Sequence, residues 1–270
     1  MVLPEGGKAL SHSTVVDLNN LVTHPEQYRF FTFRPGLKKL MLSGAAEGAH
    51  ISILWYTTAS DGTVGLHYHA MTEAVYVIDG AQRDAKGRYC TGSLCFNPPG
   101  SGHKISNSTG FFLLAYAAPP DFTNLNYIKG YTPITIDGAG FDSPTTYPFE
   151  RVQDGIEVYK VPLESEGGMT AQVIQSTSAD SYTCSGNYLL VLRGRCCVNG
   201  AIFNAGMLTV ATAIKAQSYS IRAAADSSYS ALCLSFSPTE ERQKAKNPKR
   251  AKNPTFSYIS PIAEKDSTNR

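Results

Sequence analysis

The chain has 270 residues, of which 42% are hydrophobic and 17% are charged, so it is long enough for one large or two modest folded domains and is not typical of a disordered protein. The formal net charge of +2 is too small to favour nucleic acid as a partner. No apolar run approaches the roughly 18 residues that a membrane-spanning helix needs, and the N-terminus lacks the basic end and apolar centre of a signal peptide. We therefore expect a soluble protein of the cytoplasm that binds neither nucleic acid nor membranes.

Cysteine usage favours the same compartment. The six cysteines are Cys90, Cys95, Cys184, Cys196, Cys197 and Cys233. Their even number is compatible with disulfides, but without a secretion signal free thiols are the expected state.

Short strand-like segments dominate the first half of the chain. Residues 1 to about 28 are polar and weakly patterned, apart from a short strand or turn at 13–18. Further strands are predicted at residues 28–33, 37–42, 51–58, 73–78, 93–96 and 111–117. The segment 51–58 is apolar on both alternating faces, which is typical of a strand that is covered on both sides. Turn residues separate the segments at close spacing, and this texture predicts an all-β sandwich or barrel.

A Pro- and Gly-rich stretch at 119–148 separates the two halves, and we interpret it as a connector with a docked extended segment around 131–136. Strand texture resumes at 155–161 and continues through 189–192, 207–210 and 232–236. The end of the chain is basic and broken by prolines. It predicts a mobile or surface-lying tail, with an electrostatic contact or a localisation signal as the alternative.

The two halves repeat at one constant offset. A shift of 114 residues (194 minus 80) places Gly80 on Gly194, and the same shift places Gly92 on Gly206. The apolar run that precedes the first glycine of each pair aligns without a gap. An internal repeat of this size indicates two copies of one domain.

Three histidines and one carboxylate gather in the first copy. His67 and His69 are two residues apart on a predicted strand, so their side chains point to the same face. Glu73 follows after a bend, and a turn rich in Pro and Gly precedes His103. Imidazole suits Fe, Ni, Cu or Zn, and a carboxylate favours a harder ion such as Fe(II) or Mn(II). A His-x-His pair alone is also compatible with exposed polar residues on an outer face.

The second copy has none of these four side chains. Under the 114-residue shift, the four positions are occupied by Ser181, Thr183, Asn187 and Gln217. These neutral residues are poor ligands for a divalent transition metal. The second copy is therefore predicted to be a degenerate, metal-free domain that is kept for structure.

The spacing resembles the two cupin motifs. The first motif is His-x-His, three residues, Glu, six residues and Gly, and it is matched by His67, His69, Glu73 and Gly80. The second is Gly, five residues, Pro-x-Gly, two residues, His, three residues and Asn, and it is matched by Gly92, Pro98, Gly100, His103 and Asn107. One departure is Gly62, which leaves four residues before the first histidine where the family has five.

This resemblance implies a bicupin, with two tandem cupin domains of the jelly-roll β-barrel type. The expected divisions are a metal-binding cupin domain at 1–118, a connector at 119–150, a degenerate cupin domain at 151–238 and a basic tail at 239–270. His67, His69, Glu73 and His103 would bind one metal inside the first barrel. Within the superfamily, the first barrel looks like the cupin of ChrR-type anti-sigma factors and of related acetylacetone and dihydroxyacetophenone dioxygenases.

The resemblance implies a metal-dependent oxidoreductase, with a dioxygenase of small oxygenated organic substrates as the preferred function. Fe(II) is the favoured metal, and Zn, Mn and Ni are alternatives. Four protein ligands on a six-coordinate ion leave two positions for substrate and O₂, whereas tetrahedral Zn(II) leaves none. A non-catalytic sensor of ChrR type and a metal-dependent isomerase, lyase or cyclase stay open, because fold does not determine function. No catalytic residue beyond the metal centre is identified.

Four further residues are candidates for the surroundings of the metal. Tyr89, Asn97 and Trp55 could line the barrel mouth, although core packing is the favoured interpretation for each. Asn107 could support the ligands through a hydrogen bond or stabilise a turn. A homodimer is expected, because barrels of this kind leave sheet edges and apolar faces to cover.

Overall fold

The computed structural model describes residues 13–137 and 147–237, so the predicted basic tail lies outside the described residues. One helix, α1 (Leu18–Thr23), and short 3-10 turns at Pro25–Gln27, Leu125–Tyr127 and Ser165–Gly167 accompany the strands. No described helix has the length and apolar character that crossing a bilayer requires. The strands are β1 (Ser13–Asp17), β2 (Phe31–Arg34), β3 (Leu37–Gly44), β4 (His50–Tyr56), β5 (Val64–Tyr68), β6 (Glu73–Arg83), β7 (Arg88–Cys90), β8 (Ser93–Asn97), β9 (Gly102–Tyr116), β10 (Ile134–Asp137), β11 (Glu150–Gln153), β12 (Ile156–Lys160), β13 (Met169–Ser176), β14 (Tyr182–Gly186), β15 (Tyr188–Val198), β16 (Ala201–Asn204), β17 (Met207–Ala211), β18 (Gln217–Ala223) and β19 (Tyr229–Phe236).

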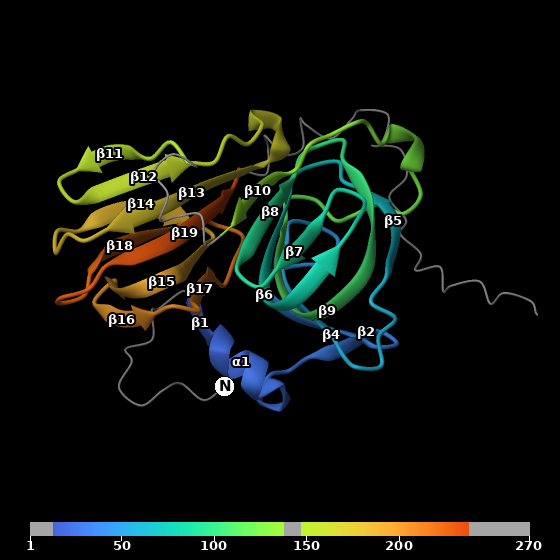
Figure 1. The fold of residues 1–270 in the computed structure, drawn as a ribbon, viewed down its shortest axis with the longest axis horizontal. Coiled ribbons are helices and arrows are strands. Elements are labelled where there is room, and N and C mark those ends of the chain that lie inside the picture. The colour runs from blue at the N-terminus through green and yellow to red at the C-terminus, as the bar shows by residue number, and fades with distance from the viewer. Residues whose placement is uncertain (1–12, 138–146, 238–270) are drawn as a thin grey trace, which may run out of the picture.

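The strands form two curled sheets that lie side by side (Figure 1). The first sheet runs β10-β8-β6-β9-β4-β3-β2, with β5 paired to β9 and β7 paired to β6. The second runs β1-β17-β15-β19-β13-β12-β11, with β16 and β18 paired to β15 and β14 paired to β18. This architecture confirms the predicted all-β fold with two tandem barrels. All six cysteines are free thiols, as predicted.

Each sheet is completed at the same edge by a segment from elsewhere in the chain. In the first sheet this segment is β10 from the predicted connector, where Ile134 lies opposite Phe96 of β8. In the second sheet it is β1 from the N-terminal end, where Ser13 lies opposite Ala211 of β17. The N-terminal residues therefore contribute to the second barrel and the connector to the first. The domain boundaries at 118, 150 and 238 stay a prediction.

The 114-residue offset recurs in the hydrogen bonds of the two barrels. The amide of Gly92 donates to the carbonyl of Val77 at 2.8 Å, and the amide of Gly206 donates to the carbonyl of Val191 at 2.8 Å. The register of β6 against β8 recurs, at the same offset, in β15 against β17. The two glycines have φ of 87° and 85°, which a residue with a β-carbon disfavours. They belong to the shared scaffold.

The offset fails for the strand that carries the first two histidines. In the first barrel, β5 pairs with β9 so that His67 lies opposite His103. In the second barrel, β14 pairs with β18 so that Cys184 lies opposite Tyr219. Ser106 of β9 and Arg222 of β18 lie opposite the equivalent residues Arg83 and Cys197, so Tyr219 is the counterpart of His103 and Cys184 that of His67. The expected equivalences with Gln217 and Ser181 are wrong.

A shorter connection explains the difference. Residues 69–72 form a bend between β5 and β6, whereas one residue separates β14 from β15. His69 lies in that bend. The second barrel lacks it, so His69 has no counterpart there and the expected equivalence with Thr183 also fails.

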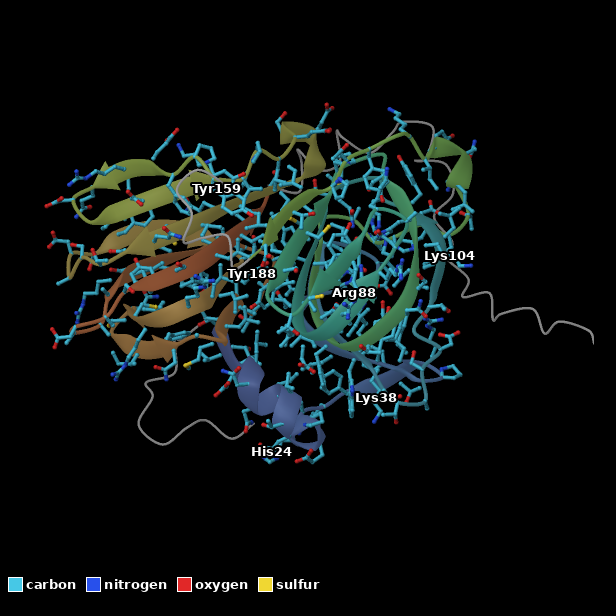
Figure 2. All side chains as sticks on the ribbon, in the orientation of Figure 1. His24, Lys38, Arg88, Lys104, Tyr159 and Tyr188 are labelled. Atoms are coloured by element: carbon cyan, nitrogen blue, oxygen red, sulfur yellow. The ribbon has the colours of Figure 1, made fainter. Side chains whose placement is uncertain are left out.

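The central strands are apolar on both faces because each faces two cores. Along β6, Val75 and Val77 line the interior of the first barrel, whereas Ala74 and Tyr76 belong to a core that the two barrels share. The same alternation occurs along β15, whose Tyr188 is in the shared core and lies between the barrels in Figure 2. The prediction of strands covered on both sides is confirmed, and the shared core joins the barrels into one unit.

Candidate metal centre

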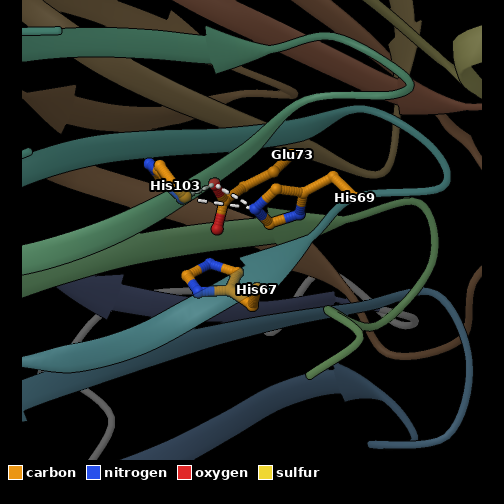
Figure 3. Close-up of side chains that lie close together, drawn as sticks. All are labelled: His67, His69, Glu73 and His103. Atoms are coloured by element: carbon orange, nitrogen blue, oxygen red, sulfur yellow. Dashed lines mark hydrogen bonds and ion pairs between the residues drawn. The ribbon is translucent and has the colours of Figure 1, made fainter. Parts of the chain in front are cut away.

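Four buried side chains meet inside the first barrel (Figure 3). His67 is on β5, His103 is on β9, Glu73 begins β6, and His69 lies in the bend between β5 and β6. One potential ligand atom from each lies within 4.8 Å of those from the other three. In the described part of the chain, this is the one group of three or more His, Cys, Asp or Glu residues recognised as able to hold a metal ion. The structure therefore brings together all four predicted ligands.

The histidines are oriented so that their Nε2 atoms can face a common centre. Nδ1 of His67 lies 2.8 Å from the carbonyl oxygen of Gly65, and Nδ1 of His103 lies 2.9 Å from Oδ2 of Asp84. Both Nδ1–H groups donate to these oxygens, which leaves Nε2 free to bind a metal. Nε2 of His69 lies 3.2 Å from Nε2 of His103. Nδ1 of His69 is buried and has no partner among the described residues.

Glu73 is held from three sides. Its Oε2 lies 3.3 Å from Nε2 of His69 and 3.4 Å from Nε2 of His103. The amide of Asn97 donates to the same oxygen at 2.7 Å. The hydroxyl of Tyr116, which lies opposite Glu73 on β9, also donates to this carboxylate. These contacts fix the carboxylate in the orientation that a ligand needs.

Burial and neighbouring charges set the protonation states. Burial alone would lower the pKa of His103, but its hydrogen bonds to Asp84 and Glu73 outweigh burial and raise the pKa to about 9. Burial lowers the pKa of His69 to about 3 and also lowers that of His67. Burial opposes ionisation of Glu73, yet the adjacent histidines hold its pKa below the ordinary value. Without a metal, His103 is therefore protonated, Glu73 is ionised, and the other two imidazoles are neutral at pH 7.

The donor set fits a divalent transition metal. Two ligand atoms on opposite sides of an ion, each at 2.0–2.2 Å, are separated by about 4.2 Å, close to the 4.8 Å spread of the cluster. Two imidazoles and the carboxylate already have the protonation state that binding requires. Only His103 must lose a proton, from the Nε2 atom that faces Glu73.

Two of the four predicted neighbours of the metal lie in the barrel interior. Asn97 contacts the ligand Glu73, as described above. Tyr89 is buried in the same interior core as Cys95 and Tyr116.

The other two lie elsewhere. Trp55 points out of the barrel, stacks on Phe111 with ring centroids 5.2 Å apart, and packs against the shared core. Trp55 is the neighbour of the interior residue Tyr56 on β4, and successive side chains of a strand point to opposite faces, so Trp55 lies on the outer face. Asn107 is exposed and has a φ of 51° at a register irregularity within β9, so it lies at a bulge of the strand and not beside the ligands.

The sequence analysis missed Asp84, which holds His103. Asp84 is 8% exposed, and its Oδ1 accepts hydrogen bonds from the amides of Lys86 and Gly87 at 2.7 and 3.0 Å. The segment Asp-x-x-Gly signals this turn. Nothing in the sequence shows that the second carboxylate oxygen is directed at a histidine 19 residues away.

A short loop after β9 borders the site. Asp121 and Tyr68 exchange two backbone hydrogen bonds of 2.8 and 2.9 Å, which anchor the loop beside β5. The adjacent Phe122 is 52% exposed, and its ring lies 5.2 Å from that of His67. An exposed aromatic side chain therefore stands next to a predicted ligand.

Comparison with known proteins places this geometry in a family. Residues 18–119 match the family model described as the ChrR cupin-like domain, and this range contains all four side chains of the cluster. The second barrel repeats the strand order and turn glycines of the first. The chain therefore has the fold of two tandem cupin domains. No curated protein matches it.

Solved structures share the bicupin fold at low sequence identity. A candidate dioxygenase from Nostoc punctiforme is 11% identical, with 84% of each chain covered and a TM-score of 0.57. A cupin 2 conserved barrel domain protein from Leptotrichia buccalis is 11% identical, with 84% of this chain and 98% of that chain covered and a TM-score of 0.50. A mutant of Bacillus subtilis oxalate decarboxylase is 14% identical, with 87% of this chain and 80% of that chain covered and a TM-score of 0.46. The first two likenesses concern the fold and leave the reaction open.

The second barrel of the bicupin uses its equivalent positions for structure. Asn187, at the position of Glu73, is 1% exposed, and its Oδ1 accepts a hydrogen bond from the amide of Phe236 at 2.7 Å. Tyr219 and Cys184, at the positions of His103 and His67, are buried in the interior core of the second barrel. An amide side chain at the position of Glu73 can complete a backbone hydrogen bond but is a poor ligand for transition metals.

Proposed function

We propose that this bicupin is a metal-dependent oxidoreductase, a dioxygenase of small oxygenated organic substrates, with His67, His69, Glu73 and His103 as metal ligands. The observation that supports the proposal is the convergence of three Nε2 atoms and one carboxylate in a buried site. This donor set suits Fe(II), Mn(II), Ni(II) or Zn(II), and the anionic carboxylate favours Fe(II).

When bound, Fe(II) would supply a Lewis acid for an oxygen-chelating substrate and electrons for O₂. The protein would contribute orientation. Asp84 keeps the Nδ1–H tautomer of His103, and Asn97 and Tyr116 hold the carboxylate of Glu73. The apolar interior around Tyr89 and Cys95 would exclude water from the reacting groups.

A metal-responsive sensor is the second candidate, because residues 18–119 match the ChrR cupin-like family. In that role the same four side chains would bind the metal, and the response would be a change in the protein rather than turnover. A metal-dependent isomerase, lyase or cyclase is a further possibility for this scaffold.

Metal analysis and oxygen uptake test the proposal. The protein should retain one iron per chain after anaerobic purification and should consume O₂ with members of a panel of β-diketones and hydroxyketones. The substitution His69→Ala should abolish metal binding, whereas Gln217→Ala should leave it unchanged. Turnover without oxygen consumption would favour an isomerase or lyase. Tightly held zinc without turnover would refute the dioxygenase, and a ligand-dependent structural response without turnover would favour the sensor.

We also propose a homodimer. Strand β2 ends the first sheet, and its Phe31 and Phe33 are 48% and 43% exposed. An open edge with exposed aromatic side chains favours association. Light scattering coupled to size exclusion should give twice the chain mass, and a monomer at all concentrations would refute the proposal.

A further inference from the structure

A lysine side chain lies inside the first barrel. Residues alternate between the two faces along β3: Lys38 is on the outside, with Nζ 4.8 Å from the ring centroid of Trp55, and it lies at the periphery of the molecule in Figure 2. Lys39 therefore points the other way, on the same face as the interior residue Leu37. It is 7% exposed. Lysine is almost never buried unless it has a partner.

The partner that the structure shows is neutral. Nζ of Lys39 lies 3.2 Å from Nε2 of His50, and Nδ1 of His50 lies 2.9 Å from the carbonyl oxygen of Gly48. The Nδ1–H group donates to that carbonyl, so Nε2 carries a lone pair and accepts from the ammonium group. Among the described residues, no carboxylate lies within 4.0 Å of this nitrogen.

The ammonium group is therefore incompletely satisfied. It has three N–H donors, and one acceptor is present. The ring of Phe33, with its centroid 5.4 Å from Nζ, adds a weak attraction. A buried cation without an anion is destabilised by the loss of its hydration. An anionic group placed beside Lys39 would offset this cost.

The lysine shares the barrel interior with the metal ligands. His50, Tyr116 and Glu73 lie in one row across the neighbouring strands β4, β9 and β6. The ring of Tyr116 lies 4.9 Å from that of His50 and 6.3 Å from that of His69, nearly parallel to the latter. The Lys39–His50 pair and the metal ligands thus lie on either side of one tyrosine.

A buried hydroxyl lies on the same wall. Ser52 is two residues from His50 on β4, so its side chain is on the same face. It is 0% exposed, and its Oγ has no hydrogen-bond partner among the described residues. A second donor without a partner is what a site for an oxyanion requires.

We propose that Lys39, held in place by His50 and assisted by Ser52, binds the carboxylate group of an organic substrate whose other oxygen atoms reach the metal ligands. The substrate class of the proposed dioxygenase is then a small keto acid rather than a neutral diketone. This inference rests on the proposed function for the metal end of the substrate. The carboxylate accepts hydrogen bonds from the remaining N–H groups of Lys39 and neutralises its positive charge. It also aligns the substrate across Tyr116.

The protonation states support this assignment. Burial lowers the pKa of Lys39 to about 8, so the amine is still mainly protonated at pH 7. Burial, with the adjacent ammonium group, lowers the pKa of His50 to about 4, so the imidazole is neutral. The pair carries one positive charge, which one carboxylate would neutralise.

Three matched probes test the proposal by calorimetry on the Ni(II)-loaded protein. Acetylacetone is the neutral reference. In 2,4-dioxopentanoate a carboxylate replaces one of its methyl groups, and in 4,6-dioxoheptanoate the carboxylate is two carbons further away. At least one of these anions should bind the wild-type protein at least tenfold more tightly than acetylacetone. In Lys39→Met, and in Lys39→Gln, its affinity should fall to within about twofold of acetylacetone, with the affinity for acetylacetone and the metal content unchanged. Lys38→Met is the matched control and should retain the preference.

The possible outcomes separate the two proposals. If neither anion binds more tightly than acetylacetone, or if both Lys39 variants retain the preference, the carboxylate subsite is refuted. If none of the probes binds, the subsite is refuted as well. If the preference depends on Lys39 but no diketone or keto acid drives O₂ uptake in the iron-loaded protein, the subsite stands and the proposed oxidation fails.

Discussion

The hydrogen bond between Asp84 and His103 makes metal binding depend on pH. In the metal-free protein His103 has a pKa of about 9, and its Nε2 proton must leave before a metal can bind. At pH 7 the protonated form exceeds the neutral form about 100-fold, so the apparent metal affinity is lowered by that factor. The affinity should therefore rise about tenfold per pH unit between pH 7 and 8.5 and become constant above pH 9 to 10. Each metal should release about one proton at pH 7.

The substitution Asp84→Asn should weaken metal binding much more at pH 9.5 than at pH 7. Loss of a carboxylate partner on a metal-binding histidine typically weakens metal affinity about 10–100-fold, which is about 1.4–2.7 kcal/mol. At pH 9.5 little proton competition is left, and this loss should appear in full. The pKa of His103 is lower in the variant, because the hydrogen bond to Asp84 is the largest single contribution that raises it. At pH 7 the gain from weaker proton competition should then offset most of the loss.

Competition with a metal-binding dye, measured with Ni(II) from pH 6.5 to 9.5, checks this reasoning. The matched control is Asp79→Asn, since Asp79 is an exposed residue of the same strand β6 and should give the wild-type profile. Calorimetry in buffers of different ionisation enthalpy counts the protons released. A wild-type affinity that does not change with pH, or equal proton release by wild type and Asp84→Asn, would show that Asp84 does not control the protonation of His103.

Three further predictions concern stability. Asn187→Ala should lower the free energy of unfolding by about 1–3 kcal/mol, because it removes the buried hydrogen bond to the amide of Phe236. Metal stoichiometry should stay unchanged, and loss of metal would contradict the structural role. Gly194→Ala should destabilise the second barrel by a similar amount or more in urea unfolding, because its φ is 69° and a β-carbon would collide with the carbonyl of Ser228. An unchanged midpoint would contradict this account. The metal-free protein should lose about 1–2 kcal/mol between pH 6.5 and 8. His103 has a folded pKa above its unfolded value, so its contribution is complete below pH 6.5 and is lost as pH rises towards 9. His103→Gln should lack this decline, and a decline of equal size in the variant would assign it to another group.

Motif spacing alone was sufficient for the four metal ligands and the turn glycines. The reason is local geometry: His67 and His69 share a strand face because of the two-residue period, and the turn glycines need φ values that other residues disfavour. The same local rules could not tell which face of β4 points inwards. For Trp55 they left both the barrel mouth and core packing open, and the structure shows it packed against the outer core.

Contacts between distant segments account for the remaining differences. A constant offset assumes equal loop lengths, and the missing bend between β14 and β15 breaks that assumption. Cys184, rather than Ser181, is the counterpart of His67. The direction of Asp84 towards His103 and the burial of Lys39 beside His50 depend on how β3, β4, β6 and β9 curl around one interior. Periodicity within a single strand carries no information on such contacts.

The sequence by itself determined an all-β bicupin with one set of metal ligands, because strand alternation, turn residues and ligand spacing are properties of short segments. The tertiary structure alone decided that β1 completes the second barrel and β10 the first. It also decided that a lysine and a neutral histidine share the interior with the predicted metal site. Those features arise from pairing between residues far apart in the chain, whose energy depends on burial and mutual geometry rather than on local pattern.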